Sequence, residues 1–146
     1  MAHVMIFVAP VPSTNREAYL EHSRKAAAIF KDLGATEIVE CWGSDVPDGE
    51  LTSLPMAVKL EEGETVVMGW IHWPSKEVRD ASMDKAMQDP RMQEIFSNMP
   101  LDGKRLIFGG FETILEACCC GRGLQRSRSR IDDRSDPKWL TSETTL

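Results

Sequence analysis

Residues 66–75 read VVMGWIHWPS, an apolar run that Pro74 and Ser75 close. β-Branched and aromatic residues dominate the run, which is typical of a β-strand over 66–73. A strand with one face in water alternates apolar with polar residues. Here one parity holds Val66, Met68, Trp70 and His72, and the other holds Val67, Ile71 and Trp73. The pattern therefore predicts a strand that is covered on both faces.

The N-terminal part predicts a strand followed by a helix. Residues 3–11 alternate among β-branched and other apolar types before Pro12, which suits a strand closed by a turn. Thr14 and Glu17 have the spacing of a capping box at the start of a helix. Apolar side chains then recur at helical spacing as far as Gly34, a residue suited to end the helix.

The middle of the chain predicts three strands. The first covers about 36–43 and is followed by a turn at 46–49, where Pro, Asp and Gly stand together. The other two, 56–60 and 66–73, flank the polar segment 61–64. We expect these two to form a hairpin.

The remaining elements are a helix in two pieces and a last strand. Ser75 is suited to cap a helix that runs to about Gln88. Asp89-Pro90 restarts it, with Asp as the N-cap and Pro at the first helical position. The last strand is expected at about 104–115. With the hairpin of 56–60 and 66–73 counted as one element, we read the order as β-α-β-β-α-β, which is the ferredoxin-like α+β fold, an antiparallel sheet with two helices on one face.

The apolar faces of the sheet carry a prediction about quaternary structure. The strand at 3–11 is apolar on both parities, as 66–73 is. Two helices cover one face of such a sheet, and residues 1–116 contain no further element for the other. A second copy of the chain would cover it, in an isologous homodimer whose sheets pack face to face. The expected partner is therefore the chain itself.

Length, composition and charge limit the classes of function. The chain has 146 residues, 42% hydrophobic and 27% charged, which indicates one ordinary globular domain rather than two. No apolar run approaches the ~20 residues of a membrane span, and the first residues lack the features of a secretory signal. A net charge of −6 disfavours binding to nucleic acid. We expect a cytoplasmic protein with no membrane and no nucleic-acid partner.

The charge is divided unevenly along the chain. Residues 1–116 hold 11 Lys and Arg against 19 Asp and Glu, a net of −8, whereas residues 117–146 hold 6 against 4, a net of +2. The second segment begins with Cys118-Cys119-Cys120 and continues with Arg and Ser, without an apolar period. We expect a folded domain at 1–116 and a disordered tail at 117–146. Association with RNA or a membrane through the tail stays an alternative.

Several long motifs in 1–116 resemble the bacterial YbaA-like family, domain of unknown function 1428. They are IVECWGSDVPDG at 38–49, the segment 70–80, DPRM at 89–92 and the segment 99–112. The resemblance implies a dimeric α+β barrel. It implies no reaction, because no activity is established for the family. Residues 117–146 lie outside the pattern, as a natural extension, a frameshifted C-terminus or an artefact.

Two residues are candidates for acid–base catalysis, Glu40 and His72. Glu40 is a carboxylate among apolar strand residues, where burial raises a pKa. The alternative is a salt bridge, across strands or across the dimer interface, to Arg105. His72 stands between two tryptophans and belongs to the side-chain type that titrates near neutral pH. Its alternative is a hydrogen-bonded interface histidine.

The candidate ligand-binding residues are Trp42, Trp70, Asp45 and Arg105. The tryptophans, with Trp73, are candidates to line a pocket, and the alternative is that they fill the core. Asp45 lies in a rigid loop that could close over a barrel mouth, although a turn alone explains an Asp there.

We expect no metal and no cofactor, because the three histidines lack the spacing of a zinc site and no phosphate-binding loop is present. The sequence thus predicts a homodimer that binds or transforms a small molecule in a Trp-lined pocket by acid–base chemistry. The alternative is a non-catalytic accessory or stress-related protein without a ligand. Whether the chain is an enzyme is left open.

Overall fold

The computed structural model describes residues 1–117, so the predicted tail at 117–146 lies outside the described residues except for Ala117. The elements follow the predicted β-α-β-β-α-β order, with an additional short helix and with the second helix in two pieces. In chain order they are β1 (His3–Pro12), the 3-10 turn η1 (Ser13–Asn15), α1 (Arg16–Asp32), β2 (Glu37–Trp42), α2 (Leu54–Ala57), β3 (Glu64–Trp73), α3 (Lys76–Gln88), α4 (Pro90–Ser97) and β4 (Ile107–Glu112).

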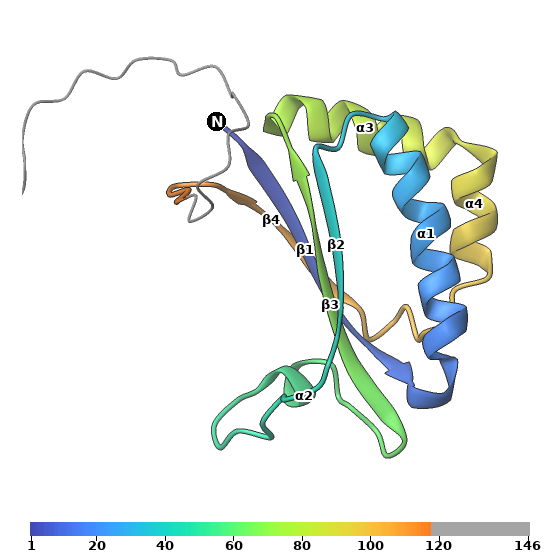
Figure 1. Ribbon diagram of the computed structural model, residues 1–146, viewed down its shortest axis with the longest axis vertical. Coiled ribbons are helices and arrows are strands. Elements are labelled where there is room, and N and C mark those ends of the chain that lie inside the picture. Colours follow the sequence, from blue (N-terminus) through green and yellow to red (C-terminus); the bar gives the residue numbers. More distant parts are fainter. Residues whose placement is uncertain (118–146) are drawn as a thin grey trace, which may run out of the picture. The chain divides into compact units, whose positions relative to one another are not determined.

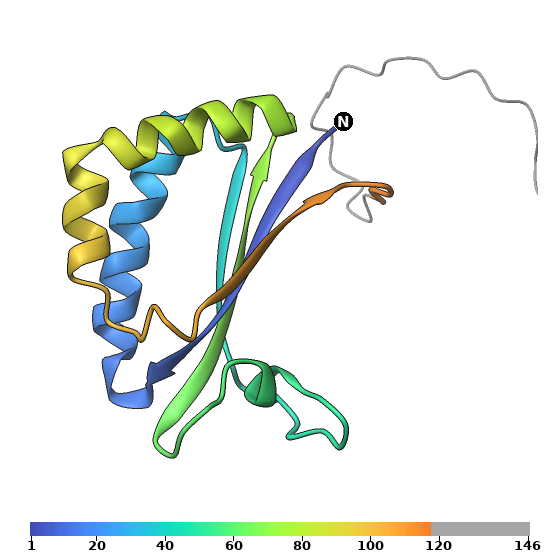
Figure 2. The same cartoon turned by 180° about the vertical axis from the view of Figure 1, so that it is seen from behind.

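The strands form one antiparallel four-stranded sheet in the order β2-β3-β1-β4. The helices α1, α3 and α4 lie on one side of this sheet (Figures 1 and 2). Phe7 of β1 is paired with Gly69 of β3 on one side and with Phe108 of β4 on the other. This arrangement confirms the predicted ferredoxin-like α+β fold.

The helix boundaries follow from local chemistry that the sequence displays. The Ser75 hydroxyl accepts a hydrogen bond from the Val78 amide at 3.2 Å and begins α3. The Asp89 carboxylate accepts one from the Arg91 amide at 2.9 Å, with Pro90 as the first residue of α4. These two caps were predicted and are confirmed.

The predicted capping box of Thr14 and Glu17 is wrong. Residues Ser13–Asn15 form a 3-10 turn instead, and α1 begins at Arg16 without a side-chain cap. Tertiary contacts hold this segment, because the Ser13 amide donates to the Gly63 carbonyl at 2.8 Å and the Ser13 hydroxyl bonds Thr65 Oγ1 at 2.7 Å. The chain is thus bonded to the beginning of β3 before it enters α1.

The predicted hairpin of 56–60 and 66–73 is also wrong. Leu54–Ala57 form a one-turn helix whose N-cap is Ser53. Val58 then packs against Val8 and Val66, on the sheet face that α1 does not cover. The apolar run is therefore satisfied by burial on a sheet face rather than by strand pairing. Figure 1 shows α2 on the side of the sheet away from α1.

The last strand is shorter than the predicted 104–115, since β4 begins at Ile107. The Asp102 carboxylate accepts hydrogen bonds from the Lys104 amide at 3.0 Å and from Arg105 Nε at 2.8 Å. This turn uses residues 102–105 before pairing with β1 starts.

The strand pairing shows which side chains share a face, and the core contacts show which face lies against the helices. On the covered face, Trp73 and Ile71 of β3 pack with Phe30 of α1 and Met92 of α4 in the largest core cluster. On the other face, which we call the open face, Val8, Pro10 and Val66 are buried at one end, and the other strand residues are half-buried or exposed. They include Val4, Ile6, Val39, Met68, Trp70, Ile107 and Phe111.

Candidate functional site

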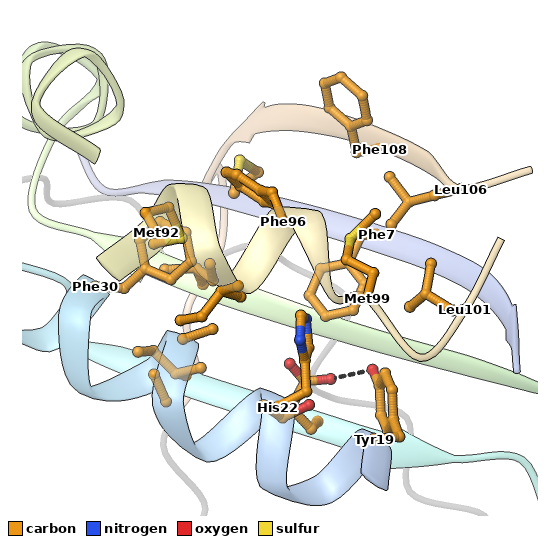
Figure 3. Close-up of a pocket in the computed structure, with 18 of the residues that line it drawn as sticks. Phe7, Tyr19, His22, Phe30, Met92, Phe96, Met99, Leu101, Leu106 and Phe108 are labelled. Atoms are coloured by element: carbon orange, nitrogen blue, oxygen red, sulfur yellow. Dashed lines mark hydrogen bonds between the residues drawn. The ribbon is translucent and has the colours of Figure 1, made fainter. Parts of the chain in front are cut away.

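A cavity of about 260 Å³ lies between the covered face of the sheet and the helices α1 and α4. Apolar side chains make most of its wall. Four are phenylalanines, Phe7, Phe30, Phe96 and Phe108, and four are methionines, Met5, Met83, Met92 and Met99. Phe108 of the edge strand β4 is 74% exposed, so the cavity is open toward this edge. Figure 3 shows these walls and, at the other end, Tyr19 and His22 of α1.

Glu40 supplies the negative charge of this wall. It lies in the middle of β2 and faces α1, and the Tyr19 hydroxyl donates a hydrogen bond to its Oε2 at 2.5 Å (dashed in Figure 3). Burial raises the pKa of the Glu40 carboxyl above its usual value, and the hydroxyls of Tyr19 and Ser23 offset part of that rise. An acid with a raised pKa in a cavity is suited to take up and release a proton.

The Tyr19 hydroxyl stays protonated beside the Glu40 carboxylate. Burial first, and then the neighbouring Glu40 charge, raise the pKa of the Tyr19 hydroxyl far above its ordinary value. Its role at Glu40 is therefore that of a hydrogen-bond donor, which stabilises the ionised carboxylate.

Three polar residues of α1 share the cavity wall, and the sequence analysis did not single them out as site residues. Tyr19, His22 and Ser23 stand at positions i, i+3 and i+4, so they lie on one helix face. The signal was the interruption of the apolar stripe by three polar groups at helical spacing. Burial, followed by the charge of Lys25, lowers the pKa of His22 and favours its neutral form.

His72 lies on the open face, away from the Glu40 cavity. Glu37 is paired with His72 and Glu40 with Gly69 across the two strands, and residues three apart in a strand point to opposite faces. His72 Nδ1 is 3.2 Å from Thr36 Oγ1, and its Nε2 is 3.3 Å from Glu116 Oε1. The expectation that Glu40 and His72 act in one pocket is therefore wrong.

The predicted Trp-lined pocket is wrong as well. Trp42 faces the helices but packs against Tyr19, at 6.1 Å between ring centroids, and lies under the Arg16 guanidinium. Trp70 is on the open face, where its Nε1 donates to Glu37 Oε2 at 2.9 Å. Trp73 is fully buried and meets Phe30 edge to face. Phenylalanine and methionine line the cavity instead.

Arg105 and Asp45 are also outside the cavity wall. The Arg105 guanidinium donates to both carboxylate oxygens of Glu64 at 2.7 Å each and to the Lys59 carbonyl at 3.0 Å. The predicted Glu40–Arg105 salt bridge is thus absent from the described chain, and Arg105 joins three segments at the end of the sheet. Asp45 is exposed in the loop between β2 and α2.

The described residues contain neither a cluster of metal-ligating side chains nor a membrane-spanning helix. Within residues 1–117, no group of three or more His, Cys, Asp or Glu side chains is arranged to hold a metal ion. No helix in the same range combines the length and hydropathy needed to cross a membrane.

Comparison with known proteins gives one family and one fold. The family described as "Protein of unknown function (DUF1428)" matches residues 2–103. The uncharacterized protein YbaA of Escherichia coli (strain K12) is 57% identical over 116 residues, which cover 80% of this chain and 99% of YbaA.

Two solved structures share the fold. Rv0793 from Mycobacterium tuberculosis has a TM-score of 0.51 at 12% identity and covers 81% of this chain and 100% of its own. A dimeric ferredoxin-like protein from an uncultured marine organism has a TM-score of 0.50 at 9% identity, covering 80% and 100%. At these identities the similarity extends to the fold alone.

Proposed function

We propose that this chain, which belongs to the DUF1428 family, binds a small, mainly apolar molecule in the Glu40 cavity and exchanges a proton with it. The observation that carries the proposal is the position of Glu40, an acid in an otherwise apolar wall with the Tyr19 hydroxyl at 2.5 Å. Burial of a carboxylate costs free energy, and buried acids with a shifted pKa are found where function uses them. Acid–base chemistry on a bound molecule is such a use.

The size of the cavity supports ligand binding over the alternative of an accessory protein without a ligand. Ligand pockets range over roughly 300–1,000 Å³, and the volume of about 260 Å³ is just below the lower end of that range. It exceeds by far the space that one water molecule needs. The cavity therefore has room for a molecule with a single ring or with two fused rings.

The proton transfer needs no further reactant. The ligand's O–H or N–H bond breaks, its proton forms a bond to a Glu40 carboxylate oxygen, and the reverse step returns it. The Tyr19 hydroxyl stabilises Glu40 while the carboxylate is ionised, and burial stabilises the protonated acid.

The proposal includes a homodimer formed through the open face. Ile107 and Phe111 are 42% and 52% exposed there, beside half-buried residues such as Ile6 and Trp70. Contiguous apolar surface of this kind marks an interface, and a neighbour of the same fold is described as dimeric. The cytoplasm stays the expected compartment on the sequence argument.

Fluorescence of 2-naphthol tests the binding and the proton transfer together, because excitation makes this probe a strong acid. We expect saturable binding to the wild type with naphtholate emission, since the proton passes to Glu40. Glu40→Gln should keep the binding and shift the emission toward neutral naphthol.

A matched pair of neighbouring alanines locates the probe. Ala27 lines the cavity, whereas Ala28 is exposed and lines a different groove between α1 and α4. Ala27→Phe should abolish binding and Ala28→Phe should leave it unchanged. Equal binding by both variants would contradict the proposed site, and unchanged emission in Glu40→Gln would contradict the role of Glu40.

A further inference from the structure

We infer that the ligand of the Glu40 cavity is an apolar organic amine, bound as its ammonium ion against Glu40. This inference rests on the proposed function, because it names the chemical class that the same cavity takes. Three observations support it: the unbalanced charge of the wall, the aromatic rings around it, and the charge of the folded domain.

The wall of the cavity contains an acid without a cationic counterpart. Among the residues that the structure describes, no Lys or Arg lines the cavity, and His22 is held in its neutral form. The groups that offset the burial of Glu40 are the hydroxyls of Tyr19 and Ser23, which are neutral donors. A buried charge is stable when it is paired with an opposite charge. A ligand with an ammonium group would supply that charge.

The rest of the wall suits the remainder of such a ligand. The faces of aromatic rings attract organic cations, and four phenylalanines and Tyr19 line the same cavity as Glu40. The methionines, among them Met92 and Met99, are flexible apolar side chains that adapt to an irregular ligand. An aromatic or aliphatic amine would be enclosed by these groups with its nitrogen directed at Glu40.

The charge of the domain favours a cation and disfavours an anion. Residues 1–116 have a net charge of −8, from 11 basic and 19 acidic residues. Such a field attracts cationic ligands and repels carboxylates. A carboxylate ligand would also place two like charges in the same apolar space. A neutral alcohol would avoid that repulsion but would leave Glu40 without a counter-ion.

The pair of a ligand ammonium and the Glu40 carboxylate also defines which proton is transferred. In an apolar environment, an ammonium and a carboxylate can neutralise each other when the N–H bond breaks and the proton forms an O–H bond with Glu40. The products are a neutral amine with a free electron pair and a neutral carboxylic acid. Within the complex, this proton exchange would therefore give the bound ammonium ion access to its nucleophilic amine form.

Three probes of similar size and shape test the inference on the purified full-length chain: 2-(1-naphthyl)ethylamine, 2-(1-naphthyl)ethanol and 1-naphthylacetic acid. Isothermal titration at pH 7 should show that the amine binds at least about tenfold more tightly than the alcohol, and the acid at least about tenfold more weakly, since an unpaired buried charge is so costly. Glu40→Gln should remove the advantage of the amine over the alcohol.

A second measurement avoids any effect of the substitution on folding. When wild-type protein is titrated at decreasing pH, protonation of Glu40 should bring the affinities of amine and alcohol together. Protonation of His22, which lines the same cavity, acts in the same direction because it adds a positive charge. If the alcohol or the acid binds as tightly as the amine, and Ala27→Phe abolishes that binding, the inference is overturned while the cavity remains a binding site. If none of the three probes binds in a way that Ala27→Phe abolishes, the proposed function fails with it.

Discussion

The two faces of the sheet are built from the same strands but have different environments. Strand β3 directs Trp73 toward the helices, where it is fully buried, and Trp70 toward the open face, where it is half-buried. The covered face contains the core and the Glu40 cavity, whereas only the short α2 segment packs on the open face, through Val58. Apolar character in a strand is therefore compatible with two outcomes, burial within one chain or a surface left for another.

The largest expected effect is a difference in the free energy of unfolding between variants of the two tryptophans of β3. Trp73→Ala should lower the free energy of unfolding by about 3–5 kcal/mol, because it empties a fully packed site. Trp70→Ala should cost less, and its cost should depend on protein concentration if the open face is a dimer interface. Urea unfolding at two concentrations measures both. Equal, concentration-independent losses would remove the distinction between the faces.

Substitution of one glycine on each face of the sheet should have a smaller effect on the free energy of unfolding. A Cβ at Gly69 would stand 2.6 Å from the Val39 carbonyl oxygen and would collide with the Phe7 ring. Gly69→Ala should therefore cost about 1–3 kcal/mol by overpacking. Gly109→Ala, whose nearest contact would be Phe111 at 3.3 Å, should cost clearly less. Thermal unfolding of the two variants compares them, and a larger loss for Gly109→Ala would contradict this account.

A charge on the open face tests the homodimer. Ile6→Lys should reduce the mass in sedimentation equilibrium at micromolar concentration from two chains to one, because it buries an unpaired charge in the interface. The folded chain itself should persist, since Ile6 is only half-buried in it. Met87→Lys, at a position 60% exposed on α3, is the control that should leave the mass unchanged. A wild-type mass of one chain would overturn the proposed dimer.

The smallest expected effect is the contribution of Glu40, the acid on the covered face, to the pH dependence of stability. The pKa of Glu40 is raised in the folded protein, so the folded state binds its proton more tightly than the unfolded state does. The contribution of Glu40 to stability is therefore fully present below its unfolded pKa and is lost as pH rises through its folded pKa. Glu40→Gln should match the wild type in acid and be the more stable protein at neutral pH. Urea unfolding across this range checks the sign, and a wild type that gains on the variant as pH rises would contradict it.

The success of sequence reasoning depended on the range of the interactions involved. The caps at Ser75 and Asp89 use atoms two or three residues apart, and both were predicted. The capping box at Thr14 failed because hydrogen bonds from Ser13 to Gly63 and Thr65, about fifty residues away, control that turn. The strand expected at 56–60 failed because Val58 found a place on the sheet.

For the candidate site, too, the sequence predicted the local feature and missed the contacts between distant residues. Glu40 was identified from the sequence because a carboxylate within an apolar strand is a local anomaly. Its partners were not, because Tyr19 reaches it from a different element. His72 and the tryptophans were grouped with it wrongly, since strand alternation separates two faces but does not say which face the helices cover.

Apart from residues 56–60, local pattern in the chain was sufficient to specify the order of strands and helices, the ferredoxin-like fold, and the presence of two apolar sheet faces. These properties depend on periodicity and capping over a few residues. The tertiary structure alone assigned Glu40 to the helix side, placed Tyr19 at 2.5 Å from it, and left His72 and Trp70 on the open face. The reason is physical: pairing register and helix packing bring together side chains that are distant in sequence, and an apolar cavity with one acid exists only after they meet.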